Sequence, residues 1–223
     1  MCGRYSATNP ARLRAAFPRF RFGGAAANQP PRYNIAPTQP VLAVRNDGED
    51  AVEEMTWGLV PAWSRDPNIG SKLINARAET LAEKPAFRDA LRRRRCVLLA
   101  DGFYEWRAKR PVRFTLTDER PFAFAGLWEP ARGGGATCTI VTCEANELVR
   151  RVHDRMPVIL ADDAVEAWLA SSELAPAEAA RLLQPYAPAA MRAADASSRL
   201  NDARYENADV LQPDDPVQTT LGF

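Results

Sequence analysis

The chain has 223 residues, of which 46% are apolar and 26% charged, and its formal net charge is +1. This length and apolar fraction suit a folded domain with a substantial core, and no apolar run is long enough to predict a membrane span or an export signal. Four cysteines and one histidine predict neither a disulfide scaffold nor a zinc site, so we expect a cytoplasmic protein without a metal or other cofactor.

The first part of the chain predicts a short helix, a loop and a hairpin. A helix is expected to begin at Asn9, its N-cap, and to end at Phe17. The segment 23–31 is rich in Gly, Ala and Pro and predicts a flexible surface loop. Residues 41–45 and 51–57 predict two strands joined across an Asn-Asp-Gly turn, which is typical of a β-hairpin.

The rest of the chain predicts strands flanked by helices. An apolar stripe at helical spacing predicts a helix over residues 85–95, after which the pattern changes towards a period of two. We expect strands at 96–100, 103–107, 112–117, 122–128, 137–143 and 156–160, and helices at 144–152, 162–169 and 176–183. This predicts an α+β fold, with a largely antiparallel β-sheet or barrel-like core flanked by helices in a single domain. The segment 213–223 is expected to be a flexible acidic tail.

The small net charge conceals an uneven distribution along the chain. Residues 1–120 carry 21 Lys and Arg against 13 Asp and Glu, a net of +8, whereas residues 121–223 carry 8 against 15, a net of −7. Because arginine suits phosphate, the basic half is compatible with a polyanion partner, and equally with an ordinary solvated surface. The run Arg92–Arg95 is expected to be mainly a solvated helix end.

Cys2 directly follows the initiator methionine. Its side chain is small, so we expect Met1 to be removed, which places an α-amine and a thiol on one residue. The amine can form a Schiff base with an aldehyde, and the thiol can then close a five-membered thiazolidine ring. A residue that merely permits removal of methionine is the alternative interpretation. The cysteines at 96, 138 and 143 are expected to be unreactive core residues.

Two further side chains are candidates for proton transfer. His153 is the only histidine, and it lies in a polar junction between a predicted helix and a predicted strand. A lone histidine is more often a structural residue. Glu105 is predicted to share a strand face with Phe103, where desolvation favours its neutral, proton-donating form. The alternative is a carboxylate in water at a strand edge.

Asn75 and Arg77 are two residues apart, so they share one face if the segment is extended. Asparagine can orient an amine or a hydroxyl group, and arginine can hold a phosphate with two N–H groups. Trp57 and Trp63 bracket a loop in which a tryptophan can stack on an exposed base, although core packing is its commoner role.

Six short motifs occur in order along the chain. They are Met1-Cys-Gly-Arg-Tyr5, Arg32-Tyr-Asn-Ile-Ala-Pro37, Trp57-Gly-Leu-Val-Pro61, Ile74-Asn-Ala-Arg-Ala-Glu-Thr80, Ala100-Asp-Gly-Phe-Tyr-Glu-Trp106 and His153-Asp-Arg-Met-Pro-Val-Ile159. As an ordered set they resemble the SOS-response-associated peptidase (SRAP) family, and the resemblance covers residues 1–212 as one domain. The segments 23–31 and 197–201 match the family only thinly, so Asn201 is given no role.

The resemblance implies a sensor of abasic sites in single-stranded DNA that crosslinks itself to them, with an associated self-processing peptidase activity. It implies that Cys2 is the nucleophile and that Asn75 positions the Cys2 amine and the sugar. Glu105 would act as acid and base in ring opening and crosslink reversal, with His153 assisting. The implied DNA contacts are Arg4, Asn34, Trp63, Arg77 and Thr142. We expect a monomer whose partner is abasic single-stranded DNA, nucleoid-associated when bound, with no membrane partner.

Two other functions remain open. Glutamine amidotransferases also begin Met-Cys-Gly, so the Cys2 thiol could attack an amide with the α-amine as base, although the expected oxyanion-hole context is not visible in the sequence. A non-enzymatic module that binds single-stranded DNA through the basic half and its tryptophans is the second alternative.

Overall fold

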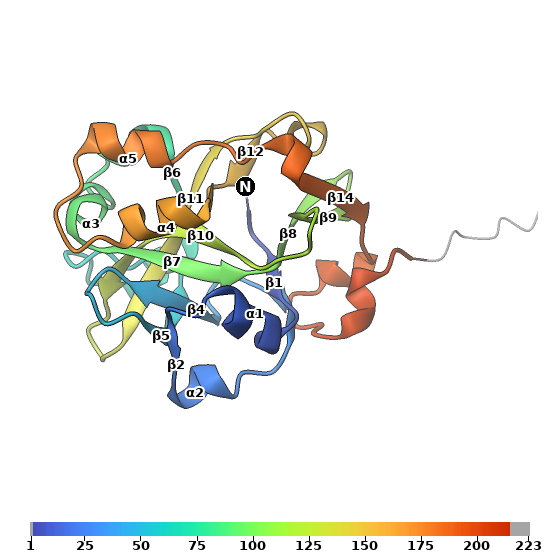
Figure 1. The fold of residues 1–223 in the computed structure, drawn as a ribbon, viewed down its shortest axis with the longest axis horizontal. Helices are drawn as coiled ribbons and strands as arrows, with labels where there is room; N and C mark the ends of the chain where they lie inside the picture. The colour runs from blue at the N-terminus through green and yellow to red at the C-terminus, as the bar shows by residue number, and fades with distance from the viewer. Residues whose placement is uncertain (1, 215–223) are drawn as a thin grey trace, which may run out of the picture.

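A computed structural model describes residues 2–214, and two β-sheets form its framework (Figure 1). The larger sheet contains a closed ring of five strands: β4 (Pro40–Arg45), β5 (Ala51–Trp57), β7 (Arg95–Ala100), β10 (Phe122–Pro130) and β11 (Ala136–Glu144). Four of the five pairings in the ring are antiparallel. The fifth, between β11 and β5, is parallel and closes the ring. The barrel-like core predicted from the alternating pattern is therefore confirmed.

Four shorter strands extend this barrel. They are β2 (Arg21–Phe22) on β5, β6 (Asn75–Arg77) and β12 (Arg155–Pro157) on β11, and β13 (Ile159–Leu160) on β10. The end of β11 has a partner on each side, because Thr142 is paired with Arg77 of β6 and with Pro157 of β12. The middle strand β11 thus brings together two segments that are far apart in the sequence.

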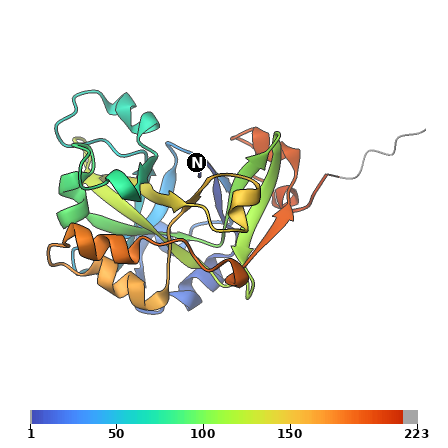
Figure 2. The same cartoon turned by 90° about the horizontal axis from the view of Figure 1, so that it is seen from above.

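The smaller sheet is antiparallel throughout. Its strands, in spatial order, are β14 (Met191–Asp195), β9 (Arg110–Leu116), β8 (Gly102–Arg107), β1 (Tyr5–Ala7) and β3 (Arg32–Ile35). In Figure 2 the strand β1, in dark blue, lies between the barrel and the β8–β9 hairpin. The ring of Tyr5 joins β1 to the barrel core through edge contacts with Trp57 and Phe124.

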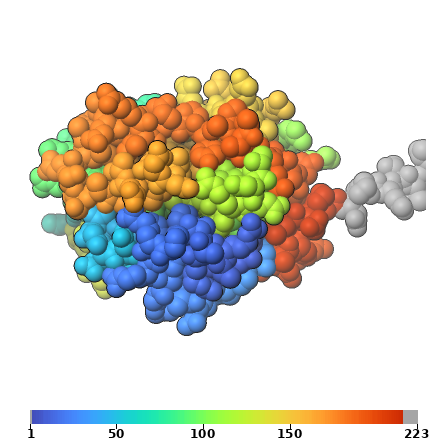
Figure 3. All heavy atoms as spheres, in the orientation of Figure 1, coloured from blue at the N-terminus to red at the C-terminus, as the bar shows by residue number. Residues whose placement is uncertain are grey.

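In the part of the chain that the structure describes, five α-helices lie around the sheets: α1 (Pro10–Ala16), α2 (Gly24–Ala27), α3 (Arg88–Arg93), α4 (Asp162–Leu169) and α5 (Pro176–Leu182). Short 3-10 helices occur at η1 (Pro67–Lys72), η2 (Ala78–Thr80), η3 (Val149–Arg151), η4 (Pro188–Ala190), η5 (Ser198–Asn201) and η6 (Ala208–Leu211). Helix α4 packs on β7 and β10. In the space-filling view of Figure 3 the N-terminal segment in blue and the α4–α5 segment in orange cover much of one face.

Most predicted elements are present close to their expected bounds, and the exceptions have local causes. The helix predicted at 144–152 is only the single turn η3. Strand β11 continues through Glu144, and the Asn146 side chain caps the short turn that follows by accepting the N–H of Val149. The loop predicted at 23–31 contains the helical turn α2, in which Ala26 is buried. The strand predicted at 156–160 is divided into β12 and β13.

Arg95 is not part of a solvated helix end; it starts β7 and is fully buried. Most of the predicted acidic tail lies outside the described residues. Within them, Asp214 accepts hydrogen bonds from the Ser197 hydroxyl and the Ser198 N–H.

Candidate active site

Cys2 lies just before β1, completely buried, and its backbone is held by the neighbouring barrel. The Asn75 side-chain amide donates to the carbonyl oxygen of Cys2 (2.8 Å). Asn75 is fixed in turn because β6 pairs with β11 and because the Trp57 indole N–H donates to the carbonyl of Ile74 (2.8 Å). The structure therefore brings together Cys2 and Asn75, and it shows Trp57 as a core residue.

The loop before β6 is positioned by a close contact between two glycines. Gly58 has φ of +140°, and a Cβ atom built on it would lie 2.8 Å from the carbonyl oxygen of Gly70. A Cβ atom on Gly70 would lie 2.6 Å from the carbonyl oxygen of Gly58. Only glycine fits either position, and the contact holds the Trp57–Trp63 loop against the turn that leads into Asn75.

Glu105 lies on the core-facing side of β8, as the alternation predicts. Phe103 shares this face and stacks on Phe114 with ring centroids 5.0 Å apart, whereas Tyr104 and Trp106 pack in a separate cluster on the opposite side. The Glu105 residue is only 3% exposed, and burial raises the pKa of its carboxyl group to about 7. A large fraction of the group is therefore protonated at neutral pH and able to donate a proton.

The charge on Glu105 also acts on Cys2. Burial, and next the nearby Glu105 carboxylate, raise the pKa of the Cys2 thiol far above its usual range. In this environment the sulfur is a neutral thiol. The arrangement favours a reaction in which the amine acts first and the thiol adds afterwards.

His153 lies between η3 and β12, partly exposed. Its Nδ1 atom accepts the backbone N–H of Arg155 (3.0 Å), and the Asp154 carboxylate lies 3.0 Å from the same nitrogen. Burial lowers the pKa of His153, so the ring is mainly neutral at pH 7. The Asp154 charge also contributes to the raised pKa of Glu105, after the larger effect of burial.

The five predicted DNA contacts differ in their accessibility. Trp63 is 61% exposed and Arg77 is exposed, so both side chains can be reached from solvent. Arg4 is partly buried and lies over the Trp106 ring, with 5.6 Å between its guanidinium carbon and the ring centroid. The prediction that Asn34 and Thr142 contact DNA stays untested, but both side chains are completely buried here.

These two buried residues hold arginines. The Asn34 side-chain oxygen accepts a hydrogen bond from Arg4 (2.6 Å), and its amide nitrogen donates to the carbonyls of Asp202 and Tyr205. The carbonyl of Thr142 accepts a hydrogen bond from the Arg155 guanidinium (2.7 Å). Asn34 thus orients Arg4 through its side chain, and Thr142 orients Arg155 through its backbone carbonyl.

Arg77 lines a hollow of about 350 Å³ together with two arginines that sequence analysis did not single out. Its lining residues are Arg77, Glu144, Arg150, Asp154 and Arg155. Arg155 lies two residues after His153 in the same motif, and this position could have identified it as a candidate site residue. No feature of the sequence identifies Arg150 as a site residue, because it lies in the acidic half of the chain.

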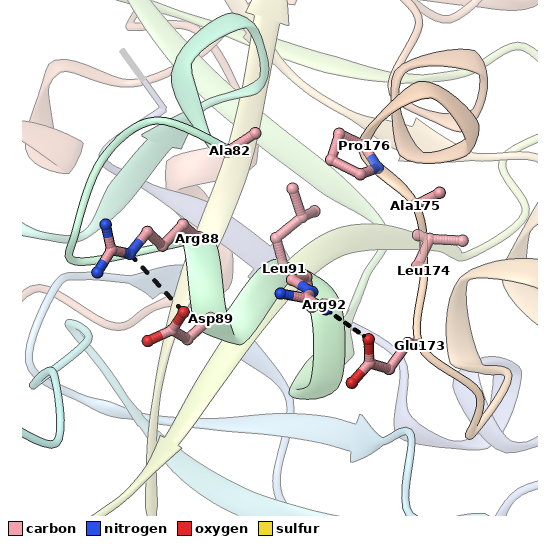
Figure 4. A pocket seen from close by; sticks show the side chains of 9 residues that line it. All are labelled: Ala82, Arg88, Asp89, Leu91, Arg92, Glu173, Leu174, Ala175 and Pro176. Atoms are coloured by element: carbon pink, nitrogen blue, oxygen red, sulfur yellow. Dashed lines mark hydrogen bonds and ion pairs between the residues drawn. The ribbon is translucent and has the colours of Figure 1, made fainter.

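A second hollow, of about 640 Å³, lies between α3 and the start of α5 (Figure 4). Its apolar floor includes Leu91, and its rim carries an ion pair between Arg92 and Glu173 (2.7 Å). It contains none of the candidate site residues, so it is separate from the chemistry around Cys2.

Within residues 2–214 no group of three or more His, Cys, Asp and Glu side chains is arranged to hold a metal ion. No helix in this part of the chain has the length and apolar character needed to cross a membrane. All four cysteines are buried free thiols, and burial raises the pKa of those at 96, 138 and 143, which confirms their prediction as core residues.

The chain is similar to proteins of one family throughout most of its length. The model of the SOS response associated peptidase (SRAP) family matches residues 1–203. The chain is 45% identical over 191 residues to the abasic site processing protein YoaM of Bacillus subtilis (strain 168), with 81% of this chain and 84% of that protein covered. It is 33% identical over an alignment of 264 residues to the abasic site processing protein HMCES of Gallus gallus, with 96% and 78% covered. A crystal structure of a Bacteroides thetaiotaomicron protein superposes with a TM-score of 0.84 at 27% identity, covering 95% of this chain and 99% of that one.

Proposed function

The chain belongs to the SRAP family, and from this premise we propose that it processes abasic sites in single-stranded DNA by forming a covalent crosslink through Cys2. The observation that carries the proposal is the placement of Cys2. The Asn75 side chain holds its carbonyl oxygen, and the nearby carboxyl group of Glu105 is buried and largely neutral. The names of YoaM and HMCES support the abasic site as the substrate.

The proposed reaction begins with removal of Met1, a hydrolysis that releases the α-amine of Cys2. Glu105 donates a proton to the ring oxygen as the C1–O bond of the abasic sugar breaks, and the anomeric hydroxyl loses its proton to a base, which leaves the isomeric open-chain aldehyde. The amine then adds to the aldehyde carbon, and loss of water gives a Schiff base. Finally the Cys2 S–H adds across the C=N bond: sulfur bonds to carbon, and the proton goes to nitrogen.

The product of these steps is a thiazolidine, and only one water is released for each crosslink. A Schiff base is an electron sink that promotes β-elimination and breaks the DNA strand. The saturated ring has no C=N bond, so it cannot act in this way. We therefore infer that the thiol protects the strand. Glu105 and His153 would supply and remove protons at the oxygen and nitrogen atoms bonded to the reacting carbon.

The DNA strand would be held by cations and an aromatic ring around this centre. Arg77 and Trp63 are exposed, and Arg4 is anchored by Asn34, so we assign phosphate contacts to the arginines and base stacking to Trp63. The protein would act as a monomer and associate with the nucleoid while bound.

The test is a denaturing gel with single-stranded DNA that bears one abasic site. Wild-type protein is expected to give a heat-stable shifted band, and Cys2→Ala to give none while cleaving part of the DNA. Cys143→Ala, which removes another buried thiol, is the matched control and should crosslink like wild type. A heat-stable band with Cys2→Ala would show that the nucleophile is assigned wrongly.

Two further measurements separate the alternatives. Mass spectrometry of the purified protein should show loss of Met1, and retained Met1 would contradict the proposed amine. Incubation with glutamine should release no ammonia. Ammonia release without crosslinking would favour the amidohydrolase, and reversible DNA binding without either reaction would favour a non-enzymatic binding module.

A further inference from the structure

An ion pair connects the two segments that carry Asn75 and His153. Arg155 reaches across the end of β11, and its NH1 and NH2 groups donate to the two carboxylate oxygens of Glu79 (2.7 and 2.9 Å). Glu79 lies on η2, immediately after β6. The ion pair therefore bridges β12 and the segment after β6, which lie on opposite sides of β11. Neither Glu79 nor Arg155 has a role in the proposed crosslinking steps.

The Arg155 side chain is tightly held at this position. It is only 11% exposed, although the Glu79 side chain is 48% exposed. The same NH2 group also donates to the carbonyl of Thr142 (2.7 Å), so the guanidinium is bound both to the middle strand and to the far segment. The hydrogen bonds from Arg155 lower the pKa of Glu79, which keeps its carboxylate ionised at neutral pH. Bidentate arginine–carboxylate pairs of this kind fix geometry as well as charge.

The backbone of Arg155 determines how the His153 ring carries its proton. Its N–H is placed to donate to Nδ1 of His153, and this hydrogen bond forms only while that nitrogen keeps its lone pair. The proton of the neutral imidazole is then on Nε2. If Nδ1 were protonated instead, this backbone hydrogen bond would be lost and the Asp154 carboxylate, 3.0 Å away, would become the partner.

We propose that the Glu79–Arg155 ion pair is a positioning element for His153: by fixing Arg155 across β11, it holds the backbone N–H that selects the Nε2–H form of the ring. This inference rests on the proposed function, in which His153 transfers protons at atoms bonded to the crosslinked carbon. Glu79 and Arg155 act through His153 and do not themselves exchange protons with the sugar. Arg155 has this role in addition to any contact with DNA.

The single histidine makes the proposal directly measurable. We would label its ring nitrogens with ¹⁵N in protein without an affinity tag and record their NMR signals above pH 8, where the ring is neutral. Wild type should show the Nε2–H form. Glu79→Gln, which keeps the side-chain size and removes the charge, should show a mixture of both forms, and Glu79→Asp should lie between the two.

Crosslinking is the second measurement. Glu79→Gln is expected to slow single-turnover crosslinking about tenfold, less than the ~10²–10⁴ that a complete general acid–base contributes. Its affinity for undamaged single-stranded DNA should not fall, because the variant removes a negative charge and leaves every arginine in place. The matched control is Glu173→Gln, since Glu173 also accepts hydrogen bonds from two arginine groups and is 46% exposed, but lies at the hollow of Figure 4. It should change neither the NMR signals nor the rate.

Three results would overturn the proposal: an unchanged Nε2–H form in Glu79→Gln, a rate loss no larger than that of Glu173→Gln, or a rate loss accounted for by weaker DNA binding. If the wild-type protein forms no crosslink at all, the proposed function fails. The NMR comparison still decides whether the ion pair selects the ring form, so the two failures are distinguishable.

Discussion

Burial sets the charge of the two groups closest to the proposed reaction. Cys2 and Glu105 are both shielded from water, so the thiol stays neutral and the carboxyl group has a pKa of about 7. Each group would carry less charge than its counterpart in water, and this reduces repulsion between them. The consequence for stability is that Glu105 carries a cost whenever it ionises in the folded protein.

Replacing Glu105 by glutamine is therefore expected to stabilise the protein at high pH. Between the ordinary carboxyl pKa of 4.5 and the folded value of about 7, the folded state binds more protons than the unfolded state. The free energy of unfolding of wild type then falls as the pH rises through this window. Glu105→Gln lacks this dependence and should gain up to about 3 kcal/mol relative to wild type above pH 7, and little below pH 4.5.

Urea denaturation at pH 4.5, 6 and 8 measures this difference. Glu173→Gln is a useful control because hydrogen bonds from Arg92 and Arg93 lower the pKa of Glu173, so its dependence has the opposite sign and lies mainly below pH 4.5, and its effect should change little between pH 6 and pH 8. A gain from Glu105→Gln that does not grow with pH would show that the carboxyl group is not held neutral by burial.

The environment of a single side chain was predictable from the sequence where it depends only on neighbouring residues in the chain. The face shared by Glu105 and Phe103 follows from strand alternation alone, and the structure confirms it. Arg95 was not predictable, because its burial depends on carbonyl groups contributed by a distant helix. The roles of the proposed site residues stay predictions, although Cys2 and Asn75 are in contact.

At the scale of elements, Arg95 joins two helix ends to the barrel. Its guanidinium donates to the carbonyls of Leu91 and Arg92 at the end of α3 and to those of Trp168, Ala170 and Ser172 around the end of α4. The last carbonyls of a helix have no partners within it, so a cation is well placed there. Because Arg95 is also the first residue of β7, one side chain fixes both helices relative to the barrel.

Arg95→Met is accordingly expected to lower the free energy of unfolding by about 2–4 kcal/mol, because it leaves several buried carbonyls without donors. Arg92→Met, on the exposed side of the same helix, should change it by about 0.5 kcal/mol or less. Urea denaturation of both variants provides the measurement. Equal effects would mean that Arg95 is not the connection between the helices.

Helices and strands were predicted correctly where the sequence has a strong local pattern. They were missed where contacts with distant segments determine the structure. The hairpin formed by β4 and β5 follows from its turn and alternation, and helix α1 follows from the Asn9 cap. The short strands β1 and β6 have three residues each, too few for a periodic signal. They are strands because β8 and β11 offer them free edges, and this is a property of the assembled sheets.

At the scale of the whole molecule, the charge asymmetry of the sequence does not divide the structure into a basic and an acidic half. The hollow beside Arg77 draws its other arginines, Arg150 and Arg155, from the acidic half of the sequence. This follows from topology, since β11 places the β6 and β12 segments on its two sides. The net charge of each half could be counted from the sequence, but the position of the cations required the fold.

DNA binding should therefore depend on where a cation lies and not only on net charge. For single strands, the logarithm of the binding constant falls with the logarithm of salt concentration by about 0.7 per phosphate neutralised. Arg77→Ala is expected to weaken binding to an undamaged oligonucleotide and to reduce this slope by about 0.7. Arg88→Ala removes the same charge from the hollow of Figure 4 and should leave the slope unchanged.

Fluorescence anisotropy across a salt series measures the slopes for both variants, and the undamaged oligonucleotide excludes crosslinking because it has no abasic site. Long-range attraction by net charge alone would lower both slopes equally, since each variant loses one positive charge. Equal changes would thus contradict a DNA path beside β6. A change confined to Arg77→Ala would place a phosphate next to Asn75 and Cys2, where the proposed reaction requires the sugar to lie.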